Sequence, residues 1–146
     1  MKTAPIPATI LALALFSTLA LAQDKKSTTP QEEEWFLCWS DFHNAKVGLV
    51  ALREAMPNFD EMVLNHDPEL NAKDCVLMLR AIFSIPDFGN TCVDLANHLP
   101  KNSPNKGFIT KHNKEILKQT KGWLKVYAAL HPVCKELEDK EAASGK

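Results

Sequence analysis

Apolar residues recur at intervals of three and four along most of the chain, which is the pattern of helices that bury one face. After Pro30 this pattern is carried by Trp35, Trp39, Phe42, Leu49, Leu52 and Met56. Thr29, Pro30 and Glu32 provide a capping residue, a proline at the first helical position and the acid of a capping box. We therefore predict one long helix over residues 30–56, which Pro57 ends.

Shorter helices are expected in the middle of the chain. One follows Asn58, where three apolar residues share a face: Phe59, Met62 and Val63. A second is predicted over residues 71–84, and it would end before Pro86 because a proline disfavours helical backbone at the preceding residue. A third is predicted over residues 87–99.

A second long helix is predicted over residues 110–140, after the turn-rich segment PKNSPNKGF of residues 100–108. Its apolar stripe consists of Ile116, Thr120, Trp123, Tyr127, Leu130, Cys134 and Leu137. Pro132 lies inside this pattern, so we expect a bend or a break there. No segment alternates apolar and polar residues as a strand does. The expected fold is all-α: a compact bundle of two long amphipathic helices and two or three shorter ones, in a single domain over residues 30–140.

The first 22 residues have the features of a secretory signal peptide. A positively charged start is followed by an apolar stretch from Ile10 and by the small-residue cleavage pattern Ala20-Leu21-Ala22. We expect flexible segments at residues 23–29 and 141–146, no membrane span after the signal peptide, and secretion to the extracellular space.

Four cysteines follow the expected signal peptide, and an even number in an oxidising compartment predicts two disulfides. If the two long helices are antiparallel, Cys38 lies near Cys134, and Cys75 meets Cys92 across the turn at Pro86. This is the pairing that we expect. The alternative pairing, Cys38 with Cys92 and Cys75 with Cys134, requires a different helix order.

Composition and motifs argue against catalysis and nucleic-acid binding. The 17 basic and 18 acidic residues give a formal net charge of -1, without the basic excess that nucleic-acid partners favour. The sequence has no nucleophile-elbow, zinc-protease, P-loop or dinucleotide-binding motif. It also lacks the paired short Cys/His spacings of a structural zinc site. We expect no enzymatic activity, no cofactor and no metal.

Binding is the remaining class of function. The first hypothesis is a secreted carrier that holds a small apolar ligand, such as a lipid, in a helical shell. Its candidate lining residues are Trp35, Trp39, Met62, Met78, Phe83 and Phe88. The general design is similar to that of insect odorant-binding proteins, although the cysteine spacing differs.

The alternative is a secreted ligand, toxin or effector that contacts an extracellular protein through an exposed helix face, as helical cytokines do. The candidate contact residues form a basic stripe that also suits a heparin-like or acidic partner: Lys111, Lys114, Lys118 and Lys121. An enclosed apolar cavity would favour the carrier, whereas a solid core with an exposed apolar patch would favour the protein partner.

Overall fold

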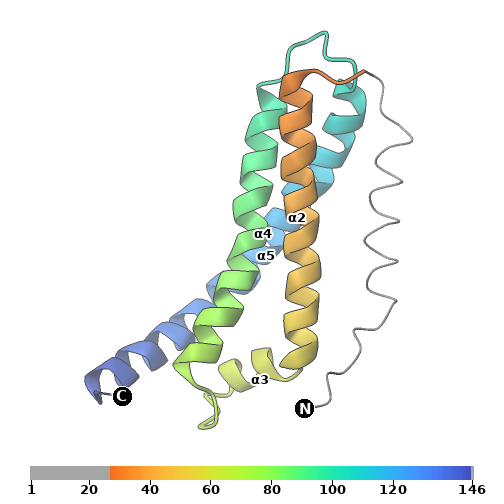
Figure 1. The fold of residues 1–146 in the computed structure, drawn as a ribbon. Helices are drawn as coiled ribbons and strands as arrows, with labels where there is room; N and C mark the ends of the chain where they lie inside the picture. The colour runs from red at the N-terminus through yellow and green to blue at the C-terminus, as the bar shows by residue number, and fades with distance from the viewer. Residues whose placement is uncertain (1–26, 146) are drawn as a thin grey trace, which may run out of the picture.

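The computed structural model describes residues 27–145, which form four helices and contain no strand (Figure 1). The helices are α2 (Pro30–Ala55), α3 (Phe59–Leu64), α4 (Ala72–Asn97) and α5 (Lys106–Ala143). The predicted all-α class is confirmed. The expected signal peptide and residues 23–26 lie outside the described residues.

The first helix begins as its sequence predicts. The Thr29 hydroxyl accepts a hydrogen bond from the backbone N–H of Glu32 at 3.3 Å, and the Glu32 carboxylate accepts one from the backbone N–H of Thr29 at 3.1 Å. This reciprocal pair is the predicted capping box, and it satisfies two backbone donors that have no partner inside the helix.

The central helix, α4, is a single helix that continues through Pro86, so the prediction of two helices divided at this proline is wrong. A proline inside a helix removes one backbone hydrogen bond and costs about 3 kcal/mol. Pro86 is fully buried, and α4 packs against α2 on one side and α5 on the other, so burial along its length offsets this cost. Over residues 27–145 the bundle therefore has three long helices and one short helix, rather than two long helices and several short ones.

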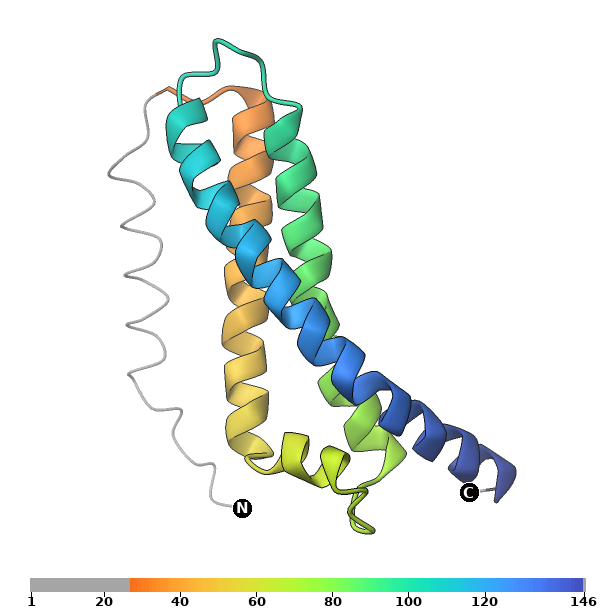
Figure 2. The same cartoon turned by 180° about the vertical axis from the view of Figure 1, so that it is seen from behind.

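The last helix, α5, is also unbroken. It begins at Lys106, four residues before the expected start, and continues past Pro132 to Ala143, so no break occurs at this proline. Its 38 residues span about 57 Å. Figure 2 shows α5 crossing α2 and α4 obliquely, with its C-terminal end projecting beyond the other long helices.

The relative directions of the three long helices determine which cysteines can form a disulfide. Because the chain reverses between α2 and α4 and again between α4 and α5, α2 and α5 run the same way (Figure 1). Cys38 of α2 is bonded to Cys92 of α4, and Cys75 of α4 is bonded to Cys134 of α5, with Cα–Cα distances of 5.6 and 5.5 Å. The expected pairing is wrong, and the alternative is present. Two disulfides are compatible with an extracellular location.

The core lies between the three long helices and is filled by large side chains. Those with almost no exposed surface include Trp35, Phe42, Leu49, Met78, Ile82, Ile85 and Ile109. The helices α4 and α5 approach closely at Gly89, where an added Cβ would overlap the Thr120 hydroxyl. Gly89 therefore sets how near the two helices can lie.

Of the helices within residues 27–145, α4 alone is long and apolar enough to cross a membrane by length and composition. Its apolar composition has another explanation in this fold. It is the central helix, it contacts both other long helices, and it carries a cysteine of each disulfide. A helix that is buried in a protein core can have the same composition as a membrane-spanning one.

Candidate functional site

An open groove of about 510 Å³ lies between α4 and α5. Its α4 wall has residues spaced by three and four, which places them on one face of the helix. The full lining consists of Val76, Leu79, Arg80, Phe83, Ser84, Asp87, Tyr127, His131 and Glu138. The groove is therefore a mixed surface with apolar and charged side chains, and it differs from the enclosed apolar chamber that a carrier would need.

Aromatic rings line the groove. The rings of Phe83 and Tyr127 lie 5.1 Å apart between centroids, and the Tyr127 ring stacks on the imidazole of His131 at 5.2 Å. Phe83 keeps 45% of its surface exposed although it belongs to the apolar face of a core helix. A half-exposed aromatic pair gives the groove apolar surface that a partner can cover.

Charged side chains of both signs stand at the edges of the groove. Arg80 and Asp87 lie two turns apart on α4, and His131 and Glu138 lie two turns apart on α5. The helices are antiparallel, with Cys75 bonded to Cys134 and Gly89 facing Thr120. Arg80 and His131 therefore lie at about the same level of the groove, and Asp87 and Glu138 lie toward its opposite ends. None of the ion pairs within residues 27–145 involves these four side chains. The charges of Arg80 and Asp87 are thus available to a partner, whereas Glu138 interacts electrostatically with Lys135.

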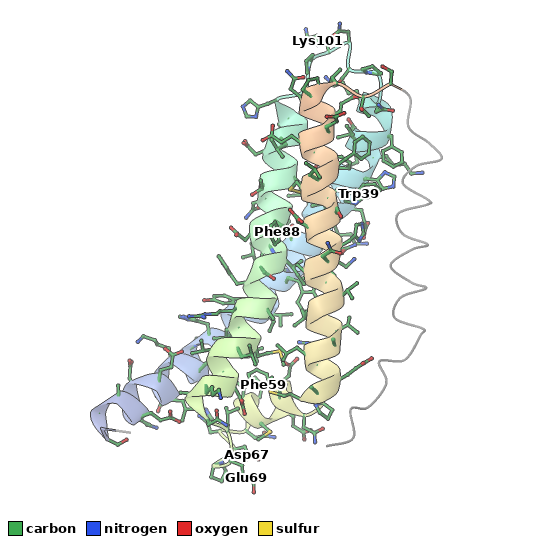
Figure 3. The ribbon with its side chains drawn as sticks, in the orientation of Figure 1. Trp39, Phe59, Asp67, Glu69, Phe88 and Lys101 are labelled. Carbon is green, nitrogen blue, oxygen red and sulfur yellow. A yellow bond between two sulfur atoms is a disulfide. The ribbon has the colours of Figure 1, made fainter. Side chains whose placement is uncertain are left out.

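The six residues expected to line a ligand cavity do not lie around a common space. Trp35 and Met78 are fully buried in the core, whereas Trp39, Met62 and Phe88 are half-buried and pack against it. Figure 3 shows Trp39 and Phe88 in the upper half of the bundle, and α3, which carries Met62, lies at the lower end. Of the six, Phe83 alone lines the groove between α4 and α5.

Two histidines and a phenylalanine surround Trp39 where α2 faces α5. The Trp39 ring lies 5.3 Å from His43, 4.9 Å from His112 and 5.5 Å from Phe108, measured between centroids. Loss of water around its ring lowers the pKa of His43, and the positive charge of Lys46 and the neighbouring His112 lower it further. In the described part of the chain, no group of three or more His, Cys, Asp or Glu side chains could hold a metal ion.

Glu32 is the one charged residue that is fully buried among the described residues. Besides its capping hydrogen bond, its carboxylate accepts hydrogen bonds from the Ser103 hydroxyl at 2.8 Å and from the backbone N–H and side-chain amide of Asn105 at 2.7 and 2.9 Å. Burial by itself would raise the pKa of Glu32, but the hydrogen bonds from Asn105, Ser103 and Thr29 outweigh it, so the pKa lies below its ordinary value. A carboxylate held ionised and fully hydrogen-bonded has a structural role and is not free to transfer protons.

The four lysines expected to face a partner are exposed on α5: Lys111, Lys114, Lys118 and Lys121. The sequence pattern placed these lysines on one face of the helix, and the structure shows that this face is exposed. The pattern also placed Phe83 and Tyr127 on apolar helix faces, but it did not show that they meet. The signal that could have found the groove is the spacing of Arg80, Phe83 and Asp87, which puts an aromatic side chain between two charges on one helix face.

No protein-family model, curated protein or solved structure matches this chain.

Proposed function

We propose that this chain is an extracellular, non-enzymatic binding protein that recognises a protein partner through the groove between α4 and α5. The observation that carries this proposal is the contact between Phe83 and Tyr127 in an open groove whose edges have unpaired charges. Protein interfaces concentrate their binding energy in aromatic and arginine side chains surrounded by a polar rim. The secreted location, which follows from the sequence features of residues 1–22, is part of the same proposal.

The shape of the groove supports an amphipathic helix of the partner as its occupant. A groove between two helices accepts a third helix, whose apolar side chains at three- and four-residue intervals cover the apolar strip. Here that strip contains Leu79, Phe83 and Tyr127. Arg80 and Asp87, which lie two turns apart on α4, would favour a bound helix that carries complementary charges at matching positions.

A carrier of a small apolar ligand is the second candidate and has weaker support. Trp35 and Met78, which would have to line its cavity, are packed inside the core with no exposed surface. A ligand there would have to displace tightly packed side chains, and interiors resist such changes because they are packed like organic crystals. The groove itself is open to solvent and carries charges that an apolar ligand would have to desolvate.

Site-specific photocrosslinking tests the proposal. A benzophenone amino acid replaces Phe83 in one variant and Leu37, an exposed residue of α2 that is 69% accessible, in the matched control. Each is incubated with extracellular fluid and cell surfaces from the source tissue. We expect the probe at position 83, and not the one at position 37, to form a discrete protein adduct.

A competition experiment shows whether the adduct forms because the partner binds in the groove. Wild-type protein without the benzophenone residue, added in excess, should abolish the adduct. A Leu37→Ala/Val47→Ala variant, which changes two exposed residues of α2, should compete equally well. A Phe83→Ala/Tyr127→Ala variant should fail to compete. Equal competition by both variants would refute the groove as the binding site. Saturable displacement of a fluorescent fatty acid that is lost in Phe83→Ala/Tyr127→Ala would instead support the carrier.

A further inference from the structure

Five lysines form one continuous surface on α5, which we call the lysine stripe: Lys111, Lys114, Lys118, Lys121 and Lys125. Their spacing alternates between three and four residues, so they occupy one face of the helix over about 21 Å. All five are exposed. Ile116 and Thr120, on the opposite face of the same turns, are buried against the bundle. The lysine stripe therefore points away from the core along its whole length.

The charge of the lysine stripe is not neutralised within the described residues. Over residues 106–125 there are six lysines and a single acidic residue, Glu115, whose carboxylate accepts a hydrogen bond from Gln119 at 3.1 Å. Farther along α5, lysines have acidic partners: Lys135 contacts Asp139 and Lys140 contacts Glu136, each at 2.6 Å. Charge is thus segregated along α5, with unpaired cations in its first half and ion pairs in its second.

This segregation opposes helix stability, because like charges three or four residues apart destabilise a helix by about 0.2–0.5 kcal/mol per pair. It does not follow from composition either, since the whole chain has a formal net charge of -1. A concentrated strip of cations raises the local concentration of anionic partners and speeds their association. The lysine stripe has the properties of a surface that binds a linear polyanion.

We propose that the lysine stripe binds a linear sulfated polysaccharide of the heparan sulfate class. Lysine ammonium groups suit sulfate groups because they act as point charges that a flexible chain can meet in succession. A membrane surface fits less well, since insertion needs protruding apolar side chains. Leu117 and Leu124, which flank the stripe, are each only 37% exposed. The two disulfides are compatible with the extracellular compartment in which such polysaccharides occur.

Binding to heparin by the purified, disulfide-bonded protein tests this proposal. The test variant is Lys114→Gln/Lys118→Gln/Lys121→Gln. The matched control, Lys73→Gln/Lys101→Gln/Lys135→Gln, loses the same charge from exposed lysines elsewhere. We expect the test variant to lose retention on heparin at physiological salt. Its log–log salt dependence should be shallower by roughly two to three, because each lost contact releases about one counterion fewer.

Two further measurements show whether binding depends on the positive charge of the stripe and on the sulfate groups of the polysaccharide. The Lys114→Arg/Lys118→Arg/Lys121→Arg variant should keep its affinity for heparin, and hyaluronan, which carries carboxylates but no sulfates, should bind far more weakly than heparin. Equal loss of retention in the test and control variants would overturn the proposal by showing a bulk charge effect. Stripe-dependent binding to phosphatidylserine vesicles that exceeds binding to heparin would assign the surface to membranes instead.

Discussion

Glu32 and Asn105 lie 73 residues apart in the chain and are joined by two hydrogen bonds, at 2.7 Å from the Asn105 backbone N–H and 2.9 Å from its side-chain amide. This contact ties the start of α2 to the start of α5. The hydroxyl of Ser103 donates a third hydrogen bond to the same carboxylate. The buried Glu32 side chain therefore holds the end of the loop between α4 and α5. The two helices begin at the same end of the bundle, and Glu32 fixes that end.

We predict that Glu32→Gln lowers the free energy of unfolding by about 3 kcal/mol. Glutamine keeps the size of the side chain but loses its negative charge, and its amide N–H group would face Ser103 and Asn105, which are themselves donors. Hydrogen bonds to charged groups contribute about 1.5–3 kcal/mol each. Chemical denaturation measures this change. The control is Glu33→Gln in the same helical turn, where the exposed side chain should contribute less than about 0.5 kcal/mol. Similar losses in the two variants would contradict a special role for Glu32.

The stability of the protein should also depend on Glu32 below its ordinary pKa of 4.5. The pKa of Glu32 is lower in the folded protein than in the unfolded chain, so folding favours the ionised form. Its contribution is therefore complete above the unfolded pKa and is lost as the pH falls through the lower folded pKa. Unfolding free energies measured between about pH 2 and 6 should show the wild type losing its advantage over Glu32→Gln toward the acidic end. A constant difference between the two proteins would refute this prediction.

Two glycine-to-alanine substitutions in long helices should have opposite effects. Alanine at position 89 would overlap the Thr120 hydroxyl and approach the Thr120 Cβ and the Phe42 ring to 3.2 and 3.3 Å, so we expect a loss of about 1–3 kcal/mol. At Gly122 of α5 an added Cβ meets no atom within 4 Å apart from its chain neighbours and the backbone of its own helix, so Gly122→Ala should gain about 0.5–1 kcal/mol from helix propensity. Thermal and denaturant unfolding of the two variants compare them directly.

A second substitution identifies the cause of the loss at position 89. Thr120→Ala removes the overlapping hydroxyl, which is buried and has no hydrogen-bond partner among the described residues. The double variant Gly89→Ala/Thr120→Ala should therefore be more stable than the sum of the two single changes indicates, which a double-mutant cycle measures. If the stability losses of the two single variants simply added up, the contact with the Thr120 hydroxyl would not be the reason that residue 89 must be glycine.

Removal of either disulfide should cost about 4 kcal/mol. The bridges close loops of similar length, with sequence separations of 54 and 59, so the chain-entropy model gives nearly equal effects. Cys38→Ala/Cys92→Ala and Cys75→Ala/Cys134→Ala should therefore be destabilised alike in urea unfolding, and each should retain its other bridge in non-reducing peptide mapping. A mapped bond between Cys38 and Cys134 in the wild type would contradict the helix order.

Local signals in the sequence account for the class of the fold and for most helix ends. The capping box of Thr29 and Glu32, the end of α2 before Pro57 and the start of α4 after Asn71 all depend on residues within one turn. The helix faces that pack into the core also follow from spacing, as Phe42 and Leu49 on α2 show. The outward position of the lysines on α5 follows in the same way, because an outward face is the complement of an apolar stripe.

Pro86 shows where local signals cease to be sufficient. If Pro86 ended one helix and a new helix followed it, the chain would reverse direction once more. The last helix would then run antiparallel to the first, and Cys38 would lie beside Cys134. In the structure, burial of α4 between α2 and α5 outweighs the local cost of the proline, so that reversal is absent and Cys38 meets Cys92.

The sequence by itself thus determined most of the helical residues and which face of each helix is apolar, because both depend largely on neighbours three or four residues away. Only the tertiary structure decided the direction of α5, the disulfide partners, the contact of Phe83 with Tyr127 and the burial of Glu32 against Asn105. These pairs are separated by at least 44 residues, and which of them meet depends on the packing energy of the whole bundle, which no local pattern contains.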